Sequence, residues 1–428
     1  MHNTEVLEYS KPVPALRSFY EPLVLKALEG MNNGSLLLTF PDGEKMRFGE
    51  SGSTLQATVR VVRPGFFRKC LLYGDVGFGE AYVDGDWETD DIAKVISWFL
   101  LNADTAPTIS GTRRRMWILN LLKVANRFAH LVRDNTPRGS RRNIRAHYDL
   151  SNDFFRMFLD PGMTYSSAYF AAPGLSLEQA QTEKYDRLCR QLHLQSKDHV
   201  LEIGSGWGGF AIHAARKYGC RVTTVTVSEK QFEYTRERIR LEGLEDRVEI
   251  RFQDYRTITG SYDKIVSIEM LEAVGHRHME TFFAKCHAVL KKDGLLGLQV
   301  IAAPDSRYDS LRKGVDWIQK HIFPGSLLPS IARINRAINR TGDMTLHDIK
   351  DLGLHYARTL QQWRDNFNRN GDKIRDLGFD ERFRRKWNYY FSYCEAAFAM
   401  RNISVLQMVY ARPNNALLRR PTYDMECR

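Results

Sequence analysis

The sequence predicts an α/β protein: a Rossmann-like domain with a mostly parallel sheet, preceded by a small α+β domain. Two observations indicate the larger domain. From about residue 143, short apolar segments alternate with charged segments of helical spacing, which is typical of βαβ units. One apolar segment, 200–203, runs into the glycine-rich turn 204–209 and then a helix. Near the N-terminus, Pro41-Asp42-Gly43 separates two short strand-like runs and predicts a hairpin.

The elements follow in order along the chain. Strands are expected in the N-terminal domain at 35–40, 45–48 and 57–62, with a helix at 92–101. In the second domain, strands are expected at 199–203, 221–227, 248–253, 262–270 and 295–301. Helices are expected at 210–218, 229–241 and 384–391. We therefore expect an N-terminal domain at 1–110, a basic helix and linker at 111–142, a catalytic domain at 143–412 and a tail at 413–428.

The segment 113–145 is strongly basic. It holds ten Arg or Lys residues against one acid, Asp134, and interleaves them with apolar residues such as Trp117 and Phe128. This pattern predicts an amphipathic helix that binds an anionic membrane surface. The alternative is a helix that packs its apolar face on the protein and leaves its charges in water.

Composition narrows the classes of partner and compartment. The net charge of +11 favours a polyanion, which leaves nucleic acid, an anionic membrane or a phosphorylated substrate open. No apolar run approaches the ~20 residues of a membrane span, and residues 1–10 do not resemble a signal peptide. The six cysteines are scattered singly, which predicts free thiols and no metal site. We expect a cytoplasmic protein that associates peripherally with the inner face of the membrane.

The glycine-rich turn, Glu202-Ile203-Gly204-Ser205-Gly206-Trp207-Gly208, lacks the lysine of a phosphate-binding loop and the spacing of a dinucleotide fingerprint. It resembles motif I of class I S-adenosylmethionine (SAM) methyltransferases. That resemblance implies SAM as cofactor and a site at the carboxyl ends of successive strands. The alternative is a glycine turn without a ligand. The expected cofactor-binding residues are Tyr165, Ser166, Glu202, Gly204, Gly206, Gly208, Thr226, Ser228, Gln231, Asp254 and Tyr255.

Further segments resemble one methyltransferase family in order along 143–412. They are His147-Tyr148-Asp149-Leu150-Ser151-Asn152-Asp153-Phe154-Phe155, Met163-Thr164-Tyr165-Ser166-Ser167-Ala168-Tyr169-Phe170, Gln253-Asp254-Tyr255-Arg256 and Ser267-Ile268-Glu269-Met270-Leu271-Glu272-Ala273-Val274-Gly275. Together they resemble the cyclopropane-fatty-acid synthase and mycolic acid methyltransferase family. Upstream, Gly79-Glu80-Ala81-Tyr82 and Gly85-Asp86-Trp87 resemble the N-terminal domain of full-length bacterial synthases.

The resemblance implies a mechanism and a set of catalytic residues. An alkene of a phospholipid acyl chain takes the methyl group of SAM, and a bound bicarbonate deprotonates the resulting carbocation to close a cyclopropane. Glu272, Tyr356 and Cys394 match family positions that hold or surround bicarbonate. Ser167 stands where the family usually has cysteine, and Gln299 where many members have histidine. Ala273 also replaces a common histidine.

The predicted function is therefore formation of a cyclopropane fatty acid on an unsaturated membrane phospholipid. Because the departures at 167, 273 and 299 affect the step after methyl transfer, a methylene- or methyl-branched lipid is the alternative product. A non-catalytic lipid-binding homologue and a nucleic-acid methyltransferase are further alternatives. No nucleic-acid target motif is seen, so we expect no nucleic acid as partner. Because full-length family members are often dimers, we expect a homodimer.

Overall fold

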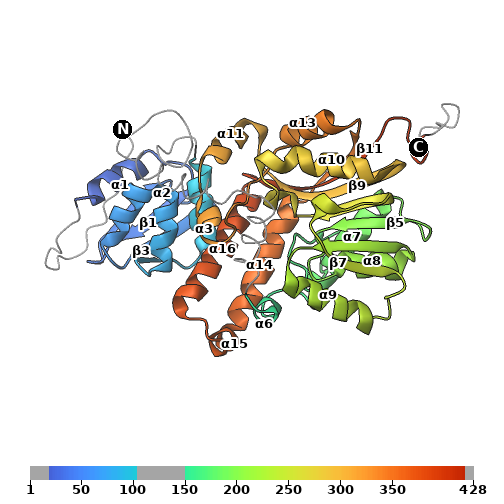
Figure 1. Ribbon diagram of the computed structural model, residues 1–428. Coiled ribbons are helices and arrows are strands. Elements are labelled where there is room, and N and C mark those ends of the chain that lie inside the picture. Colours follow the sequence, from blue (N-terminus) through green and yellow to red (C-terminus); the bar gives the residue numbers. More distant parts are fainter. Residues whose placement is uncertain (1–18, 104–149, 420–428) are drawn as a thin grey trace. The chain divides into compact units, whose positions relative to one another are not determined.

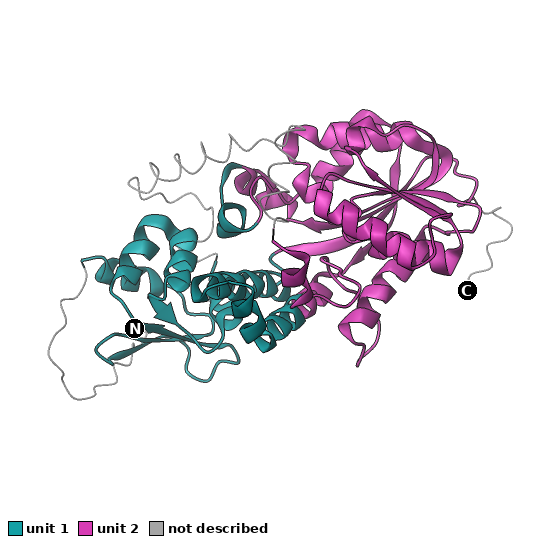
Figure 2. Cartoon of the chain, turned by 60° about the horizontal axis from the view of Figure 1, so that its bottom comes forward, with its two compact units in different colours: residues 1–132, 313–322, 360–402 teal, residues 133–312, 323–359, 403–428 magenta. Residues whose placement is uncertain are grey.

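The computed structural model describes residues 19–103 and 150–419 of the chain (Figure 1). These residues belong to two compact units, coloured separately in Figure 2. The first unit comprises 1–132, 313–322 and 360–402, and the second comprises 133–312, 323–359 and 403–428. The predicted basic helix at 113–145 lies outside the described residues.

The second unit is built on a seven-stranded sheet. Its strand order is β10-β11-β9-β8-β5-β6-β7. The five strands from β9 to β7 are parallel to one another, whereas β11 is antiparallel to both β9 and β10. The bounds are β5 His199–Ile203, β6 Arg221–Thr226, β7 Val248–Phe252, β8 Tyr262–Ile268, β9 Leu290–Ala302, β10 Thr345–Asp351 and β11 Ser404–Ala411. The predicted Rossmann-like, mostly parallel sheet is confirmed.

Helices accompany this sheet and bury its apolar side chains. They are α6 Asn152–Arg156, α7 Leu177–Gln191, α8 Gly209–Tyr218, α9 Glu229–Leu241, α10 Met279–Val289, α11 Asp305–Lys313, α13 Ile331–Thr341 and the first turns of α14 Gly353–Arg369. Short 3-10 helices follow β7 (η2, Tyr255–Thr257) and β8 (η3, Leu271–Ala273; η4, His276–His278). The strands carry near-continuous apolar runs, because helices cover both faces of such a sheet.

The order of the strands fixes where a ligand can bind. The chain runs from β5 outward to β6 and β7, and then returns to the other side of β5 as β8. The strand order therefore reverses between β5 and β8. In open parallel sheets, the carboxyl ends of the strands at such a reversal form the ligand crevice.

The first unit contains a four-stranded sheet of order β2-β1-β3-β4. Its strands are β1 Ser35–Thr39, β2 Lys45–Gly49, β3 Gln56–Val61 and β4 Trp87–Glu88, and β1 pairs antiparallel with β2 as the hairpin predicted. Its helices are α1 Glu21–Leu28, α2 Gly65–Val83, α3 Ile92–Leu101, α12 Trp317–His321, the later turns of α14, α15 Gly371–Asp376 and α16 Glu381–Ala399. The predicted N-terminal α+β domain is confirmed in fold.

The first unit draws residues from late in the sequence because aromatic side chains of α12 and α16 complete its core. Trp317 and Tyr389 pack at 4.6 Å between ring centroids, and a Cβ on Gly79 of α2 would lie 2.6 Å from Trp317. The segments 313–322 and 360–402 fall within the range 143–412 that the sequence groups as one domain. These two segments therefore belong to the first unit in space, although they lie inside the second domain in sequence.

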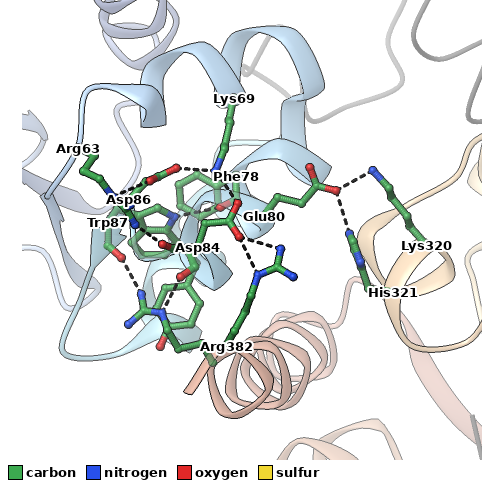
Figure 3. Close-up of polar contacts among 12 residues, drawn as sticks. Arg63, Lys69, Phe78, Glu80, Asp84, Asp86, Trp87, Lys320, His321 and Arg382 are labelled. Carbon is green, nitrogen blue, oxygen red and sulfur yellow. Dashed lines mark hydrogen bonds and ion pairs between the residues drawn. The ribbon is translucent and has the colours of Figure 1, made fainter. Parts of the chain in front are cut away.

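The Gly85-Asp86-Trp87 segment of the first unit is held by a cluster of ion pairs (Figure 3). The Lys69 ammonium lies 2.6 Å from a carboxylate oxygen of both Asp84 and Asp86. Arg382 of α16 binds Asp84 at 2.8 Å, so the cluster joins the N-terminal sheet to a helix that lies 298 residues later. This motif has a structural role in the first unit.

Candidate active site

The glycine-rich turn after β5 adopts the backbone that its sequence predicts. Gly204, Gly206 and Gly208 have φ values of +99°, +49° and +87°, which a residue with a Cβ rarely adopts. A Cβ on Gly204 would also lie 3.2 Å from the Met270 side chain. The turn is fixed to the neighbouring strand, because the Gly204 and Ser205 N–H groups donate to Val225 O at 3.0 and 3.1 Å. Backbone is therefore exposed to a ligand without an intervening side chain.

A pocket opens at this turn, at the carboxyl ends of β5, β6, β7 and β8. Nine of the expected cofactor-binding residues line it: Tyr165, Ser166, Glu202, Gly204, Gly206, Thr226, Gln231, Asp254 and Tyr255. All belong to the second unit. The structure thus brings together residues from four strand ends and from the segment before α7.

Two expected cofactor residues do not line the pocket, and each has a local structural role. Gly208 caps α8 in the left-handed conformation, and a Cβ there would lie 2.8 Å from Thr235 of α9. Ser228 is the N-cap of α9, where its hydroxyl accepts a hydrogen bond from the Gln231 N–H. Gly208 and Ser228 therefore fix the starts of the helices next to the pocket and do not line it.

Glu202 lines the pocket from β5, which lies between β8 and β6 in the sheet. Its Oε2 accepts a 2.6 Å hydrogen bond from the Thr224 hydroxyl on the adjacent strand β6. Burial raises the pKa of Glu202 to about 8, and the Thr224 hydrogen bond and the Lys184 charge oppose that rise. A buried carboxyl with a pKa close to neutrality is typical of a functional site.

Asp254 and Tyr255 close the far side of the pocket. The Asp254 carboxylate accepts hydrogen bonds from the Arg256 backbone N–H at 3.0 Å and the Arg256 Nε at 2.9 Å. Tyr255 packs edge-on against Phe282 at 5.4 Å between centroids. Arg256 also lines the pocket and was not predicted from the sequence.

The predicted catalytic residues Ser167, Gln299 and Tyr356 meet on a fourth residue, Glu269. Its Oε1 accepts from the Ser167 backbone N–H at 2.8 Å and from the Gln299 amide at 2.7 Å. Its Oε2 accepts from the Tyr356 hydroxyl at 3.0 Å. The Ser167 hydroxyl instead donates to Ala168 O, so Ser167 contributes only its backbone here. Glu269 lines the pocket directly after β8.

The orientation of Gln299 is set by a second hydrogen bond. Its Oε1 accepts from the Gln407 amide at 2.9 Å, and the Gln407 Oε1 accepts from Arg187 at 2.7 Å. Because arginine can only donate, this chain of bonds directs the Gln299 NH₂ group toward Glu269. The amide therefore faces the carboxylate with its donors.

Glu272 is buried on η3, three residues after Glu269. Its Oε1 accepts from the Ile301 backbone N–H, and its Oε2 has no hydrogen-bond partner among the described residues. Burial and the charge of Glu269 raise the pKa of Glu272 to about 8. Glu272 is therefore largely protonated at neutral pH, whereas the neighbouring Glu269 carboxyl accepts three hydrogen bonds.

One cation, Lys184 of α7, is buried beside these acids. Its side chain is fully covered, and its ammonium donates to the Ser166 hydroxyl at 2.7 Å. Burial lowers the pKa of Lys184 to about 7, and the charges of Glu269, Asp160 and Glu202 oppose that change. Lys184 supplies positive charge inside a site that is otherwise rich in carboxyl groups.

Cys394, the remaining predicted catalytic residue, belongs to the first unit. It lies on α16, and burial raises the pKa of its thiol. Its participation in the active site stays a prediction. The five cysteines among the described residues are free thiols, as expected.

Sequence reasoning missed two residues that the geometry makes central, Glu269 and Lys184. Glu269 lies in the segment 267–275 that resembles the family, but the resemblance points to Glu272 and not to Glu269. A carboxylate directly after a strand, three residues before a second one, was the available signal. Lys184 had no such signal, because a lysine in a helix as charged as α7 is usually exposed to water.

Comparisons with known proteins agree with this geometry. The family model described as mycolic acid cyclopropane synthetase matches residues 135–408. The chain belongs to this family. It is a SAM-dependent methyltransferase related to cyclopropane-fatty-acyl-phospholipid synthases, as the sequence resemblance predicted.

Two relatives match most of the chain. The tuberculostearic acid methyltransferase UfaA1 of Mycobacterium tuberculosis is 38% identical over 81% of this chain and 81% of its own. The cyclopropane-fatty-acyl-phospholipid synthase of Escherichia coli K12 is 35% identical over 83% of this chain and 88% of its own.

A solved member of the cyclopropane synthetase family has the same fold. The cyclopropane synthase MmaA2 of M. tuberculosis is similar with a TM-score of 0.59 and 30% identity, over 64% of this chain and 98% of its own. The mycolic acid cyclopropane synthase CmaA1 was solved with S-adenosylhomocysteine, the demethylated cofactor, and has a TM-score of 0.58 at 30% identity, over 63% of this chain and 97% of its own.

The site of this family member fits SAM and does not fit bicarbonate as expected. The pocket offers SAM an exposed glycine backbone and polar groups at four strand ends. The donors expected to hold bicarbonate, in contrast, already bind the Glu269 carboxylate. The expectation of a bound bicarbonate therefore disagrees with this geometry.

Proposed function

We propose that this protein transfers the methyl carbon of SAM to the double bond of an unsaturated phospholipid acyl chain, with a cyclopropane fatty acid as the product. The observation that supports this most is the arrangement of the pocket. Three residues at family positions that lie far apart in sequence, Ser167, Gln299 and Tyr356, converge on one carboxylate that lines the pocket. The E. coli relative, named for this reaction, aligns with 83% of the chain.

The chain's own residues bind and orient the reactants. SAM supplies an electrophilic methyl group when bound. Gly204 and Gly206 offer backbone to it, Gln231 is positioned by its hydrogen bond from Thr226, and Tyr255 adds an apolar wall. An alkene is a weak nucleophile, so rate depends on positioning and on exclusion of water. Phe155 packs against Tyr165 at 5.5 Å and against Trp207 at 5.0 Å between ring centroids. Because Tyr165 and Trp207 line the pocket, this aromatic group helps to exclude water from it.

A methylene- or methyl-branched lipid is the second candidate product. Gln299 supports it, because this residue replaces a histidine common in the family and cannot titrate near neutral pH. The relative that is 38% identical is named a tuberculostearic acid methyltransferase. The products share the methyl transfer. A methylene branch forms when a hydride shifts from the methyl-bearing carbon to the cationic carbon before the methyl group loses its proton, and a saturated methyl branch requires a further reduction by a separate reductant.

Peripheral membrane binding follows from the proposed substrate, whose acyl chains lie inside a bilayer. Among residues 19–103 and 150–419, no helix is long and apolar enough to cross a membrane. The net charge of +11 favours an anionic surface. Co-sedimentation with anionic and with neutral vesicles, with double-stranded DNA as competitor, tests this binding against nucleic-acid binding. Light scattering tests the expected homodimer.

Fatty-acid analysis of a bacterial host lacking its own synthase tests the proposed function. After expression, gas chromatography–mass spectrometry should reveal a fatty acid heavier by one CH₂, and hydrogenation should distinguish a ring from a branch. Gly204→Ala is the control, because its Cβ would meet Met270 and its φ is strained for alanine. A branched product would move the assignment to the second candidate. Absence of any new lipid at verified expression would contradict both.

A further inference from the structure

The donors assigned by family resemblance to bicarbonate hold a side chain of this protein. Ser167 N–H and Gln299 NH₂ bind one oxygen of Glu269, and Tyr356 OH binds the other. These three groups come from three separate segments: the stretch before α7, strand β9 and helix α14. A carboxylate and a bicarbonate present the same pair of anionic oxygens to such donors.

The backbone at Glu269 is also unusual. Its φ of +49° lies in the left-handed region, which costs a non-glycine residue about 1 kcal/mol or more. Its N–H still donates to Gln299 O at 2.7 Å, so the left-handed turn comes directly after the last ladder bond between β8 and β9. Strain of this kind persists where the surrounding structure requires a particular side-chain direction. Here it directs the carboxylate into the pocket.

The surroundings of Glu269 suit an ionised but basic carboxylate. Burial raises its pKa, whereas hydrogen bonds from Gln299 and Ser167, the Lys184 charge and the Tyr356 hydroxyl oppose the rise. A carboxylate whose pKa is raised is a better proton acceptor than an exposed one. Glu272, its protonated neighbour, does not compete with it for this role.

We propose that the Glu269 carboxylate replaces bicarbonate in this enzyme and is the base that removes the proton after methyl transfer. This inference rests on the proposed function. The π pair of the alkene forms a bond to the methyl carbon, and the pair of the breaking carbon–sulfur bond stays on sulfur. The other alkene carbon becomes a cation. Glu269 then takes a proton from the new methyl group, and the released C–H pair closes the ring.

The charges balance through this step. Glu269 enters as a carboxylate and leaves as a neutral acid, and the cationic sulfonium becomes a neutral thioether. Glu269 returns its proton to water when the products leave. In the methylene-branched alternative, a hydride first shifts from the methyl-bearing carbon to the cationic carbon, and the same carboxylate then takes a proton from the methyl group to leave a C=CH₂ branch.

Two substitutions separate this role from a structural one. We call the Ser167 N–H, Gln299 NH₂ and Tyr356 OH donors the cradle. Glu269→Gly empties this cradle and suits the positive φ at position 269, so it should fold at least as well as the wild type. Glu269→Gln keeps the cradle filled with a group that cannot accept the proton. Glu249→Gln, on the exposed surface of β7, is the matched control. Calorimetric titration with SAM should show that all four proteins still bind the cofactor, because the substitutions spare the glycine turn, and so confirms that the variants are folded.

Activity in buffer purged of carbon dioxide, with and without added bicarbonate, is the main test. The wild type should have the same rate in both. Glu269→Gly should be about 100-fold slower without bicarbonate and recover about 10-fold or more with it, whereas Glu269→Gln should stay slow in both. A wild-type rate that falls without bicarbonate would overturn the proposal, as would a fast Glu269→Gly in purged buffer.

A binding measurement keeps the proposal testable apart from the lipid reaction. Broadening of the ¹³C signal of labelled bicarbonate should be absent with the wild type and with Glu269→Gln, and present with Glu269→Gly. Bicarbonate binding by the wild type at equal strength would refute the replacement even if no lipid product is found. If only the lipid assay fails, the proposed function fails and the occupancy of the cradle is still decided.

Discussion

The Tyr356 hydroxyl donates a 3.0 Å hydrogen bond to Oε2 of Glu269 and thereby joins α14 to the end of β8. The other oxygen of this carboxylate is bound by Ser167 and Gln299. Tyr356 thus binds the carboxylate oxygen opposite the one that Ser167 and Gln299 bind, and the three donors together fix the plane of the carboxylate. Substitutions that leave the packing intact can therefore test the orientation of Glu269 separately from its presence.

Tyr356→Phe should lower the rate of lipid methylation about 10-fold or more with little change in SAM affinity. The reason is that a hydrogen bond to a charged group contributes about 1.5–3 kcal/mol, and its loss frees one carboxylate oxygen. Tyr218→Phe is the matched control, because its hydroxyl binds Asp186 outside the pocket. Steady-state kinetics with calorimetry measures both quantities. An unchanged rate would contradict a role for this bond.

Thr224→Val should weaken SAM binding about 10-fold, because it removes the 2.6 Å hydrogen bond that Glu202 accepts and leaves a buried carboxyl without that donor. Thr223→Val, the adjacent position on β6, removes instead a contact with His199 on the other face of the sheet. Calorimetric titration compares the two variants. Equal affinities would show that Glu202 does not depend on Thr224.

The contribution of Glu272 to the unfolding free energy should fall as pH rises from about 4.5 to about 8. Glu272 has its pKa raised from 4.5 to about 8 by burial and by Glu269, so the folded state keeps a proton that the unfolded state has lost. Stability from this group is full below the unfolded pKa and is lost as pH passes the folded pKa. Glu202 acts in the same direction.

Glu272→Gln should therefore remove this contribution, which is on the order of 5 kcal/mol across the range. Urea unfolding at several pH values measures it, with Glu249→Gln as the control for loss of an exposed carboxylate. A slope equal to that of the wild type would mean that Glu272 is not held neutral in the folded protein.

Gly79→Ala should destabilise the first unit by about 1–3 kcal/mol, because its Cβ would lie 2.6–2.7 Å from the rings of Trp317 and Tyr389. Gly371→Ala on α15 is the control, since a Cβ there meets no atom within 4 Å. Its effect should be neutral or slightly stabilising. Thermal unfolding of the full chain gives both values, and equal melting temperatures would contradict the tight approach.

Much of the second unit could be predicted from local patterns. The strands were visible as apolar runs, and the Gly204–Gly206 turn had a chemical reason for its glycines. The role of Glu269 could not be predicted in this way, since its three donors are 102, 30 and 87 residues away in sequence. Burial of Lys184 likewise depends on tertiary packing that overrides the polar character of α7.

The make-up of the first unit has a consequence for how the protein is synthesised. Its four strands and the helix α3 are made once residue 101 has been synthesised, yet the helix that supplies Tyr389 and Arg382 ends at Ala399, about 300 residues later. At ~5–20 residues per second, a ribosome needs roughly 15–60 s to make that stretch. During this time the first unit lacks part of its apolar core, so the nascent chain is expected to need protection by a chaperone until α16 has been made.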